Sequence, residues 1–268
     1  MPRRIVLSIA GSDPSGGAGI QADLKTFTAL GVYGAAAITC LTVQNTGGVR
    51  AFSAVDPILV RRQIEAVLSD LPVSHVKIGM IGGAAAAKAV AEALADFSGE
   101  VVYDPVLAAG DGHALLPAAD LAVLKTTVMN RATVLTPNLP ELEILSGQPE
   151  AAASLFTACP RLRALVITGG HRREEEAEIV DLLLLKEGDG LTSHEQRHPR
   201  LAGGNFHGTG CTFAAALTAC HLKYGSWPEA FRQAVAFTEA AIRAGAELKL
   251  GRGPHHPLAH HLVSPIRR

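Results

Sequence analysis

The stretch His207-Gly-Thr-Gly-Cys211 has the residue types of an anion-binding turn. It stands directly before an apolar segment with helical spacing that starts at Thr212. Consecutive small residues allow backbone N–H groups to converge on one point, and the positive end of the following helix adds to the attraction. We therefore predict that Gly208, Thr209 and Gly210 form an anion hole that stabilises a phosphoryl group during its transfer.

The same stretch places a cysteine at the start of the predicted helix. The field of the helix N-terminus lowers the pKa of a thiol, so Cys211 is a candidate acceptor for the proton of a substrate hydroxyl. The local pattern is equally typical of an ordinary cysteine that begins a helix after a glycine turn.

A second chemical pattern is Pro137-Asn-Leu-Pro-Glu141, an Asn-x-x-Glu at the end of a predicted strand. The spacing places the Asn138 amide and the Glu141 carboxylate on one side of a helical turn, where they can hold the water shell of Mg²⁺ near ATP phosphates. Taken alone, the pattern is more typical of a capping box, with Asn138 at the N-cap and Glu141 at the third helical position.

A glycine-rich loop, Gly11–Gly19, follows an apolar run at the beginning of the chain. A Walker A motif is excluded, because Gly17 stands where the lysine must be. The relaxed dinucleotide fingerprint does match Gly17–Ala22, but it begins well after the strand and no ribose-binding acid follows. The loop by itself leaves open a dinucleotide site or a simple turn before a helix.

These motifs need a scaffold, and the hydrophobic pattern predicts an α/β fold. Short apolar runs alternate with segments of helical period, which indicates a mostly parallel sheet with helices on both faces. The runs lie at 5–10, 35–43, 76–78, 101–103, 133–135 and 164–167, and the helical segments at 22–30, 58–68, 84–95, 120–128 and 139–145. Segments 179–185 and 191–198 read as an antiparallel hairpin at the sheet edge, followed by helices at 211–223 and 227–250.

Polar residues directly follow the predicted strands. Ligands of open α/β sheets bind outside the carboxyl ends of the strands, so these residues are candidates for one common site. They are Gly11–Asp13, Gln44–Thr46, Gly79–Met80, Asp104–Pro105, Pro137–Asn138 and Gly169–His171.

Composition narrows the classes of protein. The chain has 268 residues, 48% of them hydrophobic, which suits one domain over 1–268. A net charge of -1 without a basic run argues against nucleic acid as a partner. No apolar run has the length of a membrane span and no signal-peptide pattern opens the chain, so we expect a cytoplasmic protein with no membrane partner. Its four cysteines lack C-x-x-C spacing and are expected to be reduced thiols.

Taken together, the motifs resemble one family. The glycine-rich opening is followed in order by QNTGGV at 44–49, KIGM at 77–80, DPV at 104–106, TPNLPE at 136–141, GGH at 169–171 and HGTGC at 207–211. The chain is similar to the hydroxymethylpyrimidine/phosphomethylpyrimidine kinases of thiamine biosynthesis, from about Ile5 to about Gly253. These belong to the ribokinase-like superfamily, so the resemblance implies a ribokinase-like three-layer α/β/α sandwich.

The resemblance implies a reaction and an acceptor site. ATP would phosphorylate the hydroxymethyl oxygen of 4-amino-5-hydroxymethyl-2-methylpyrimidine and then the monophosphate, giving the diphosphate. The loop at Gly11 closes over this acceptor, and Asp23 points into the same pocket. Gln44 reads the aminopyrimidine through its amide, and Met80 packs on the ring face.

The resemblance also implies the ATP side of the site. Cys211 stands where related sugar kinases carry an aspartate base, and His207 is interpreted as making a loop hydrogen bond. Asn138, Glu141, Thr168 and Gly170 would contact ATP or its phosphates, and Asp104 and Glu141 would hold Mg²⁺ through water. The implied cofactors are ATP, Mg²⁺ and a monovalent cation, the partners are small molecules, and the assembly is a homodimer.

Two departures from the family pattern affect phosphate binding. Many relatives have lysines where this chain has Gly110 and Thr168. Nearby Arg172 or Arg173 either compensates or is a solvated surface charge.

Two other functions remain open. A pyridoxal kinase of the same fold is one, because some such enzymes share the Gly-Thr-Gly-Cys sequence. A non-catalytic pyrimidine-binding protein is the other, although the intact Asn138, Glu141 and Cys211 argue against it. The pairs His255-His256 and His260-His261 are expected on a flexible or surface tail without a metal.

Overall fold

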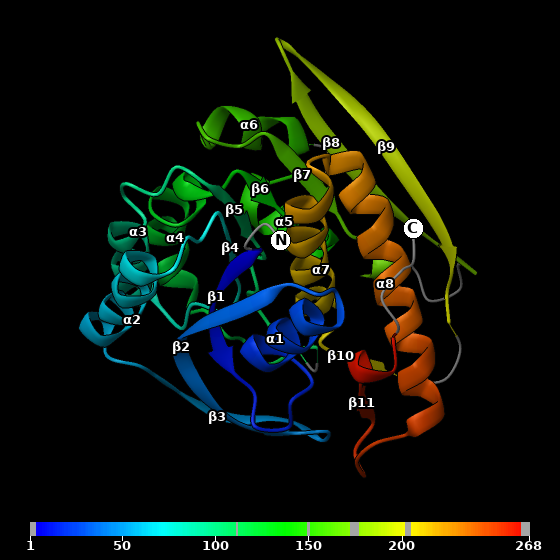
Figure 1. Ribbon diagram of the computed structural model, residues 1–268. Helices are drawn as coiled ribbons and strands as arrows, with labels where there is room; N and C mark the ends of the chain where they lie inside the picture. Colours follow the sequence, from blue (N-terminus) through cyan, green and yellow to red (C-terminus); the bar gives the residue numbers. More distant parts are fainter. Residues whose placement is uncertain (1–3, 111, 149–150, 172–176, 202–204, 264–268) are drawn as a thin grey trace.

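The computed structural model describes residues 4–110, 112–148, 151–171, 177–201 and 205–263. Within these ranges the strands form one nine-stranded sheet, in the order β3-β2-β1-β4-β5-β6-β7-β8-β9, and a separate pair, β10 and β11 (Figure 1). The strands are β1 Ile5–Ser12, β2 Tyr33–Asn45, β3 Gly48–Ala54, β4 His75–Ile78, β5 Glu100–Tyr103, β6 Val134–Leu135, β7 Ala164–Ile167, β8 Glu178–Glu187, β9 Gly190–Pro199, β10 Asn205–His207 and β11 His255–Pro257.

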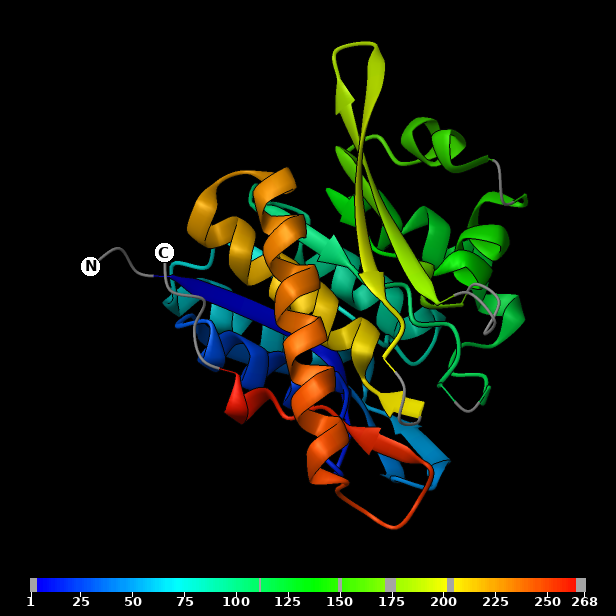
Figure 2. The ribbon, with the colours of Figure 1, turned by 90° about the vertical axis from the view of Figure 1, so that its right-hand side faces the viewer.

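The centre of the sheet is parallel from β2 through β7, and β8 and β9 continue it as an antiparallel hairpin. This confirms the predicted parallel sheet with its edge hairpin, which projects beyond the other strands in Figure 2. The sequence prediction missed β3, which pairs antiparallel with β2 at the opposite edge. Its residues are largely exposed and lack the apolar alternation that reveals a half-buried strand.

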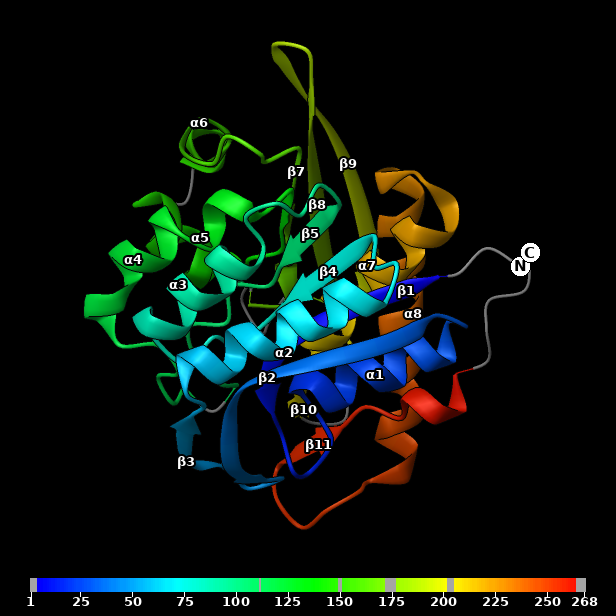
Figure 3. The ribbon, with the colours of Figure 1, turned by 60° about the vertical axis from the view of Figure 1, so that its left-hand side comes forward.

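Helices cover both faces, as predicted for a three-layer sandwich. Adjacent strand residues face opposite sides, so Leu7 of β1 belongs to the hydrophobic cluster under α2–α6, and Val6 to the cluster under α1, α7 and α8. Figure 3 shows α2 and α3 in front of β4 and β5, with α7 and α8 behind them. The helices are α1 Gly19–Ala29, α2 Pro57–Asp70, α3 Ala84–Ala93, α4 Leu121–Thr126, α5 Leu139–Ser146, α6 Ser154–Ala158, α7 Thr209–Tyr224 and α8 Trp227–Leu248.

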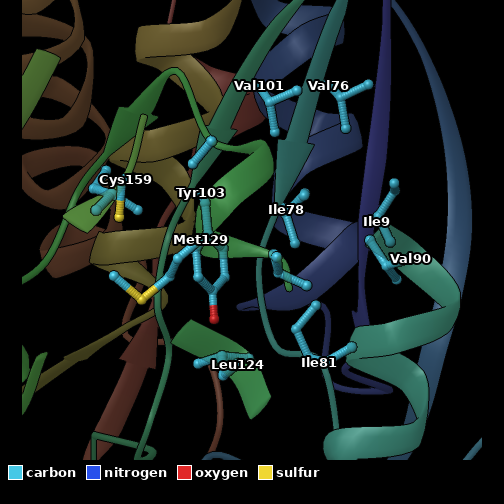
Figure 4. Packing of buried hydrophobic residues seen from close by; sticks show 14 of the residues in the cluster. Ile9, Val76, Ile78, Ile81, Val90, Val101, Tyr103, Leu124, Met129 and Cys159 are labelled. Atoms are coloured by element: carbon cyan, nitrogen blue, oxygen red, sulfur yellow. The ribbon is translucent and has the colours of Figure 1, made fainter. Parts of the chain in front are cut away.

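The larger cluster fixes the end of the sheet that carries the candidate site. Strand side chains Ile9, Ile78 and Tyr103 pack in it with Ile81 and Met129 from the connecting segments (Figure 4). Because these strands are buried and aligned, the polar residues that follow them emerge at one edge. None of the described helices is long and apolar enough to cross a membrane.

The C-terminal segment differs from the flexible or surface tail expected from its sequence. β11 pairs in parallel with β10, and the His260 side chain is 1% exposed, with its Nε2 2.8 Å from Thr212 Oγ1. That expectation was wrong for His260, whereas His261 is exposed and His255 and His256 are half-buried. The partners of this segment lie dozens of residues earlier in the chain, where local composition gives no signal.

Candidate active site

The glycine-rich loop is organised around the carboxylate of Asp13. Oδ2 accepts hydrogen bonds from the N–H groups of Gly17 and Ala18 at 3.0 and 2.9 Å, and Oδ1 accepts one from the Ser15 N–H at 2.8 Å. The Asp13 side chain is thereby buried inside its own loop. The loop is therefore a rigid turn held by a carboxylate, and its own anion occupies the N–H groups that a phosphate would need.

His207 joins this loop to two other parts of the chain. Its Nε2 lies 2.9 Å from Asp13 Oδ2 and 2.5 Å from Gln44 Nε2. Burial alone would raise the pKa of Asp13, but the hydrogen bonds from His207 and Ser15 outweigh burial and lower the pKa to about 2. His207 thus makes the loop hydrogen bond expected of it, and it brings Gln44 to the glycine-rich loop.

Gly11 and Met80 meet beside the same loop. A Cβ at Gly11 would lie 2.9 Å from Cys40 Sγ and 3.1 Å from Met80 Sδ, so only glycine fits without a shift. Met80 is buried against Cys40 and Leu115. Three of the four predicted acceptor-site residues, Gly11, Gln44 and Met80, therefore gather at the carboxyl ends of neighbouring strands.

The fourth, Asp23, is fully buried, and its role in the acceptor site stays a prediction. Its side chain is fully buried, with Lys77 Nζ 3.0 Å from Oδ1 and the Ser8 hydroxyl donating to Oδ2 at 2.6 Å. Sequence reasoning gave Lys77 no role. The available signal was a lysine inside an apolar strand, since lysine is rarely buried without a partner.

The predicted anion turn packs directly on the glycine-rich loop. Gly208 has a positive φ of 84°, and a Cβ there would lie 1.9 Å from the Gly17 carbonyl oxygen. α7 begins at Thr209, so the N–H groups of its first turn lack intrahelical acceptors. A Cβ at Gly210 would lie 3.9 Å from Asp104 Oδ2, which places that carboxylate opposite the turn.

The state of the Cys211 thiol differs from the sequence prediction. Burial raises its pKa to about 12. The charge of Lys77 and a hydrogen bond from the Gly19 N–H act in the opposite direction, whereas the negative charge of Asp104 adds to the rise. In this environment the thiol is neutral near pH 7, and the expected low pKa was wrong.

Asn138 and Glu141 form the capping box that the sequence allowed. The Glu141 N–H donates to Asn138 Oδ1 at 2.9 Å, and the Asn138 N–H donates to Glu141 Oε2 at 3.0 Å. Burial and the nearby charge of Asp104 raise the pKa of Glu141 to about 8. The capping role accounts for the positions of Asn138 and Glu141. It does not explain why the Glu141 carboxyl is buried near a second acidic group, which disfavours its ionised form.

Asp104 is a second buried acidic group, and its charge acts on Glu141. Burial raises its pKa to about 6, although Lys77 lowers it. Oδ2 of Asp104 is buried and has no hydrogen-bond partner among the described residues. Two desolvated carboxyl groups with an unpartnered oxygen fit a hard cation such as Mg²⁺, which prefers oxygen ligands.

Thr168 lies beside Asn138, and Gly170 belongs to the turn that follows Thr168. Thr168 forms a parallel bridge with Asn138, and its N–H donates to the Pro137 carbonyl at 3.1 Å. A Cβ at Gly170 would meet no atom within 4 Å, so the turn is open on that side. Arg172 and Arg173, the candidate replacements for a family lysine, lie outside the described residues.

All four cysteines are free thiols, as expected, and Cys40, Cys159 and Cys220 are buried. Burial raises the pKa of each of these three thiols. A neighbouring hydroxyl or positive charge lowers it, but burial is the larger effect in all three.

The chain matches known proteins over most of its length. The model of a family described as phosphomethylpyrimidine kinase matches residues 13–257. A hydroxymethylpyrimidine/phosphomethylpyrimidine kinase of Rhizobium meliloti (strain 1021) is 43% identical over 264 residues, which cover 94% of this chain and 96% of the relative. A thiamine biosynthesis bifunctional protein of Geobacter sulfurreducens is 41% identical, and the match covers 96% of this chain and 53% of that longer protein.

Solved structures show the same fold. The pyridoxal kinase of Bacillus subtilis, in its ADP complex, superposes with a TM-score of 0.83 at 31% identity. The match covers 96% of this chain and 97% of that one. The similarity therefore extends from the sequence motifs to the whole arrangement of strands and helices.

The Asp13 carboxylate generates a prediction for stability. We expect Asp13→Asn to lower the free energy of unfolding at pH 7 by about 2 kcal/mol, since the pKa falls from 3.8 to about 2 on folding. A lowered folded-state pKa stabilises the protein above pH 3.8, and this contribution is lost as the pH falls through 2. The difference between wild type and variant should therefore shrink between about pH 4 and pH 2.

Urea unfolding at several pH values measures this difference. Asp189→Asn, in the exposed turn between β8 and β9, is the matched control and should show no such gap. A gap for Asp13→Asn that stays constant from pH 7 to pH 2.5 would contradict the assigned ionic role.

Proposed function

Because the chain belongs to the phosphomethylpyrimidine kinase family, we propose that it transfers the γ-phosphoryl group of ATP to 4-amino-5-hydroxymethyl-2-methylpyrimidine and then to its monophosphate. The product is the diphosphate used in thiamine biosynthesis, and the whole chain acts as one kinase domain. The observation that carries the proposal is the contact between the Gly208–Gly210 turn and the glycine-rich loop, with Asp104 opposite. Phosphate-binding and acceptor-binding elements therefore adjoin one another.

We propose that Gly11, Gln44 and Met80 bind the acceptor ring. The Gln44 amide can accept from the exocyclic amine and donate to the adjacent ring nitrogen, as glutamine does with adenine. Gln44 is presented by its contact with His207, and Gly11 leaves the space that a side chain would fill. The Met80 thioether offers a polarizable surface for the ring.

The transferring phosphoryl group would face the start of α7. Phosphoryl transfer depends mostly on positioning and on stabilising negative charge. The N–H groups of Gly208, Thr209 and Gly210 supply donors, and the Lys77 ammonium supplies a fixed positive charge behind them. Lys77 is fully buried in an ion pair with Asp23, and its charge lowers the pKa of Cys211 at the start of α7.

Cys211 is proposed as the group that takes up the proton of the substrate hydroxyl. Its pKa of about 12 means that the thiolate is a strong base but is scarce at neutral pH. The Gly19 N–H and the Lys77 charge both favour the thiolate, and the charge on Asp104 opposes it. Neutralising Asp104 would therefore make ionisation of Cys211 easier.

Asp104 and Glu141 are the proposed Mg²⁺ ligands, through water, and Asn138, Thr168 and Gly170 are proposed to contact ATP and its phosphates. Mg²⁺, when bound, neutralises negative charge on the phosphates and on these carboxylates. The capping box holds Glu141 in one orientation toward the site. A monovalent cation as a further cofactor stays a prediction from the resemblance.

Pyridoxal kinase activity is the second candidate function, favoured by the close superposition on the Bacillus subtilis enzyme. A pyridine ring with a hydroxymethyl group could occupy the same acceptor site. Gln44 favours the aminopyrimidine, because the pyridine ring lacks the paired donor and acceptor that an amide reads.

The test is ADP formation by the purified protein with Mg-ATP and three separate acceptors: the hydroxymethylpyrimidine, its monophosphate and pyridoxal. We expect turnover with both pyrimidines and loss of turnover when Mg²⁺ is chelated. Turnover with pyridoxal alone would establish the second candidate, and no turnover with any acceptor would favour a non-catalytic binding protein.

Replacing the proposed base tests the mechanism. Cys211→Ala should lower kcat by roughly two to four orders of magnitude, the range for loss of a general base, with the KM for ATP little changed. Cys159→Ala, a buried thiol in the core between α4 and α6, is the control for loss of a cysteine and should keep its kcat. Turnover of Cys211→Ala near the wild-type rate would leave the backbone N–H groups as the main catalysts.

We further propose that the protein is a cytoplasmic homodimer. The cytoplasm supplies ATP, and apolar side chains cluster on exposed parts of β2 and α2: Leu41 53%, Val43 59%, Ile58 59% and Leu59 53% exposed. Burying this surface against a second copy would remove it from water. Light scattering at micromolar concentration should give a dimer mass, and Leu41→Asp with Val43→Asp should give a monomer.

A further inference from the structure

The segment Gly251–His260, near the end of the chain, contacts the turn that follows Gln44. Its Gly253 N–H donates to Thr46 Oγ1 at 3.0 Å, and its His255 N–H donates to the Thr46 carbonyl oxygen at 3.0 Å. Thr46 lies two residues after Gln44, at the turn between β2 and β3. The segment therefore holds both the side chain and the backbone of this turn.

Close backbone approach reinforces these two hydrogen bonds. A Cβ at Gly253 would lie 2.1 Å from the Thr46 carbonyl oxygen and 2.4 Å from the Gly47 nitrogen. A Cβ at Gly251 would lie 2.3 Å from Thr46 Cγ2, and Gly251 has a positive φ of 86°. Side chains at either position would push the segment away from the turn.

The same segment also holds the strand that carries His207. β11 pairs in parallel with β10, so that Pro257 is the register partner of His207. A Cβ at Gly17 would lie 3.2 Å from Pro257 Cβ, which places the proline against the glycine-rich loop as well. Figure 3 shows β10 and β11 close to the end of the sheet where β2 and β3 turn.

Beyond β11 the segment is anchored in the core. The Ala259 N–H donates to the Ala241 carbonyl of α8 at 3.1 Å, and buried His260 lies 2.8 Å from the Thr212 hydroxyl. Thr212 is the residue after Cys211 in α7. One segment of about ten residues thus touches the β2–β3 turn, the glycine-rich loop, β10 and the start of α7.

We infer that Gly251–His260 is a positioning element of the acceptor site, with Thr46 and Gly253 as positioning residues that hold Gln44 against His207. The two partners of the Gln44–His207 contact lie on elements that are far apart in the sequence, and the segment binds both. The part of the inference that concerns the acceptor rests on the proposed function of Gln44. Among the described residues, the hydrogen bonds and close approaches of the segment given above do not involve Asn138 or Thr168.

Gly253→Ala is the first test, because the added methyl group collides with the backbone of Thr46 and Gly47. We expect the KM for the hydroxymethylpyrimidine to rise about tenfold, the effect of losing roughly one hydrogen bond at the ring, with kcat and the KM for ATP within about twofold of wild type. Gly190→Ala is the matched control: its Cβ would meet its nearest atom at 3.7 Å, and it lies on the β8–β9 hairpin. A general loss of folding would instead change all three constants and the melting temperature.

Thr46→Val and Thr46→Ser are a second pair of variants that test the same contact. They change the hydrogen bond to Gly253 without adding a group that collides with the backbone. Valine keeps the shape but removes the acceptor for the Gly253 N–H, whereas serine retains a hydroxyl. The KM for the pyrimidine should rise with valine and be restored with serine. Equal KM values for wild type, Gly253→Ala and Thr46→Val would overturn the inference.

Hydrogen–deuterium exchange separates this inference from the proposed function. Peptides covering 41–48 and 205–212 should exchange faster in Gly253→Ala than in Gly190→Ala, while peptides covering 134–146 stay unchanged. If the wild type phosphorylates no pyrimidine, the proposed function is wrong. Hydrogen–deuterium exchange would still show whether the segment Gly251–His260 stabilises the β2–β3 turn and β10. Unchanged exchange in 41–48 and 205–212 would overturn the positioning role in either case.

Discussion

Backbone contact between two glycine-rich segments is the constraint on which the site depends. Gly208 and Gly17 approach so closely that no Cβ fits between them, and Gly19 meets the Gly11 carbonyl in the same way. The contact places His207 beside Asp13 and brings the Gly19 N–H to the sulfur of Cys211. Segments from opposite ends of the chain therefore share one site because both lack side chains where they meet.

A second constraint is the balance of charge under that contact. Lys77 is the cation that neutralises Asp23, yet Asp104 and Glu141 are buried nearby, and burial raises the pKa of both. Burying an uncompensated carboxylate is costly, and a bound cation would remove the cost. Burial is the main cause of the raised pKa of Cys211, and the charge of Asp104 adds to it, so this carboxylate acts on the thiol as well. The proposed Mg²⁺ site and the proposed thiolate base therefore both depend on the charge of Asp104.

Local sequence patterns predicted most of the fold and part of the site. The alternation of apolar runs and helical segments predicted the sheet and its layers, and the positions that follow the strands include Gly11, Gln44 and Met80. The strand β3 was missed because its largely exposed residues lack apolar alternation, and the buried His260 was missed because its partners are distant in sequence. Lys77 stands out locally as a lysine in an apolar strand, but only the fold shows that Asp23 is its partner. The pKa of Cys211 was mispredicted because a helix N-terminus favours the thiolate locally, whereas desolvation depends on everything packed around the sulfur.

The proposed acceptor side and the proposed ATP side of the site are held by different kinds of interaction. Asn138 and Glu141 are fixed by a capping box within three residues, so the helix that contains them also orients them. Gln44 lies near the end of a two-stranded edge, and its contact is with His207 on a separate short strand. Local order is therefore built into the ATP side, whereas order on the acceptor side must come from elements that meet across the fold. Differences in acceptor between relatives of the same fold, such as pyrimidine and pyridoxal kinases, are accordingly expected to arise on the side whose geometry is set by long-range contacts.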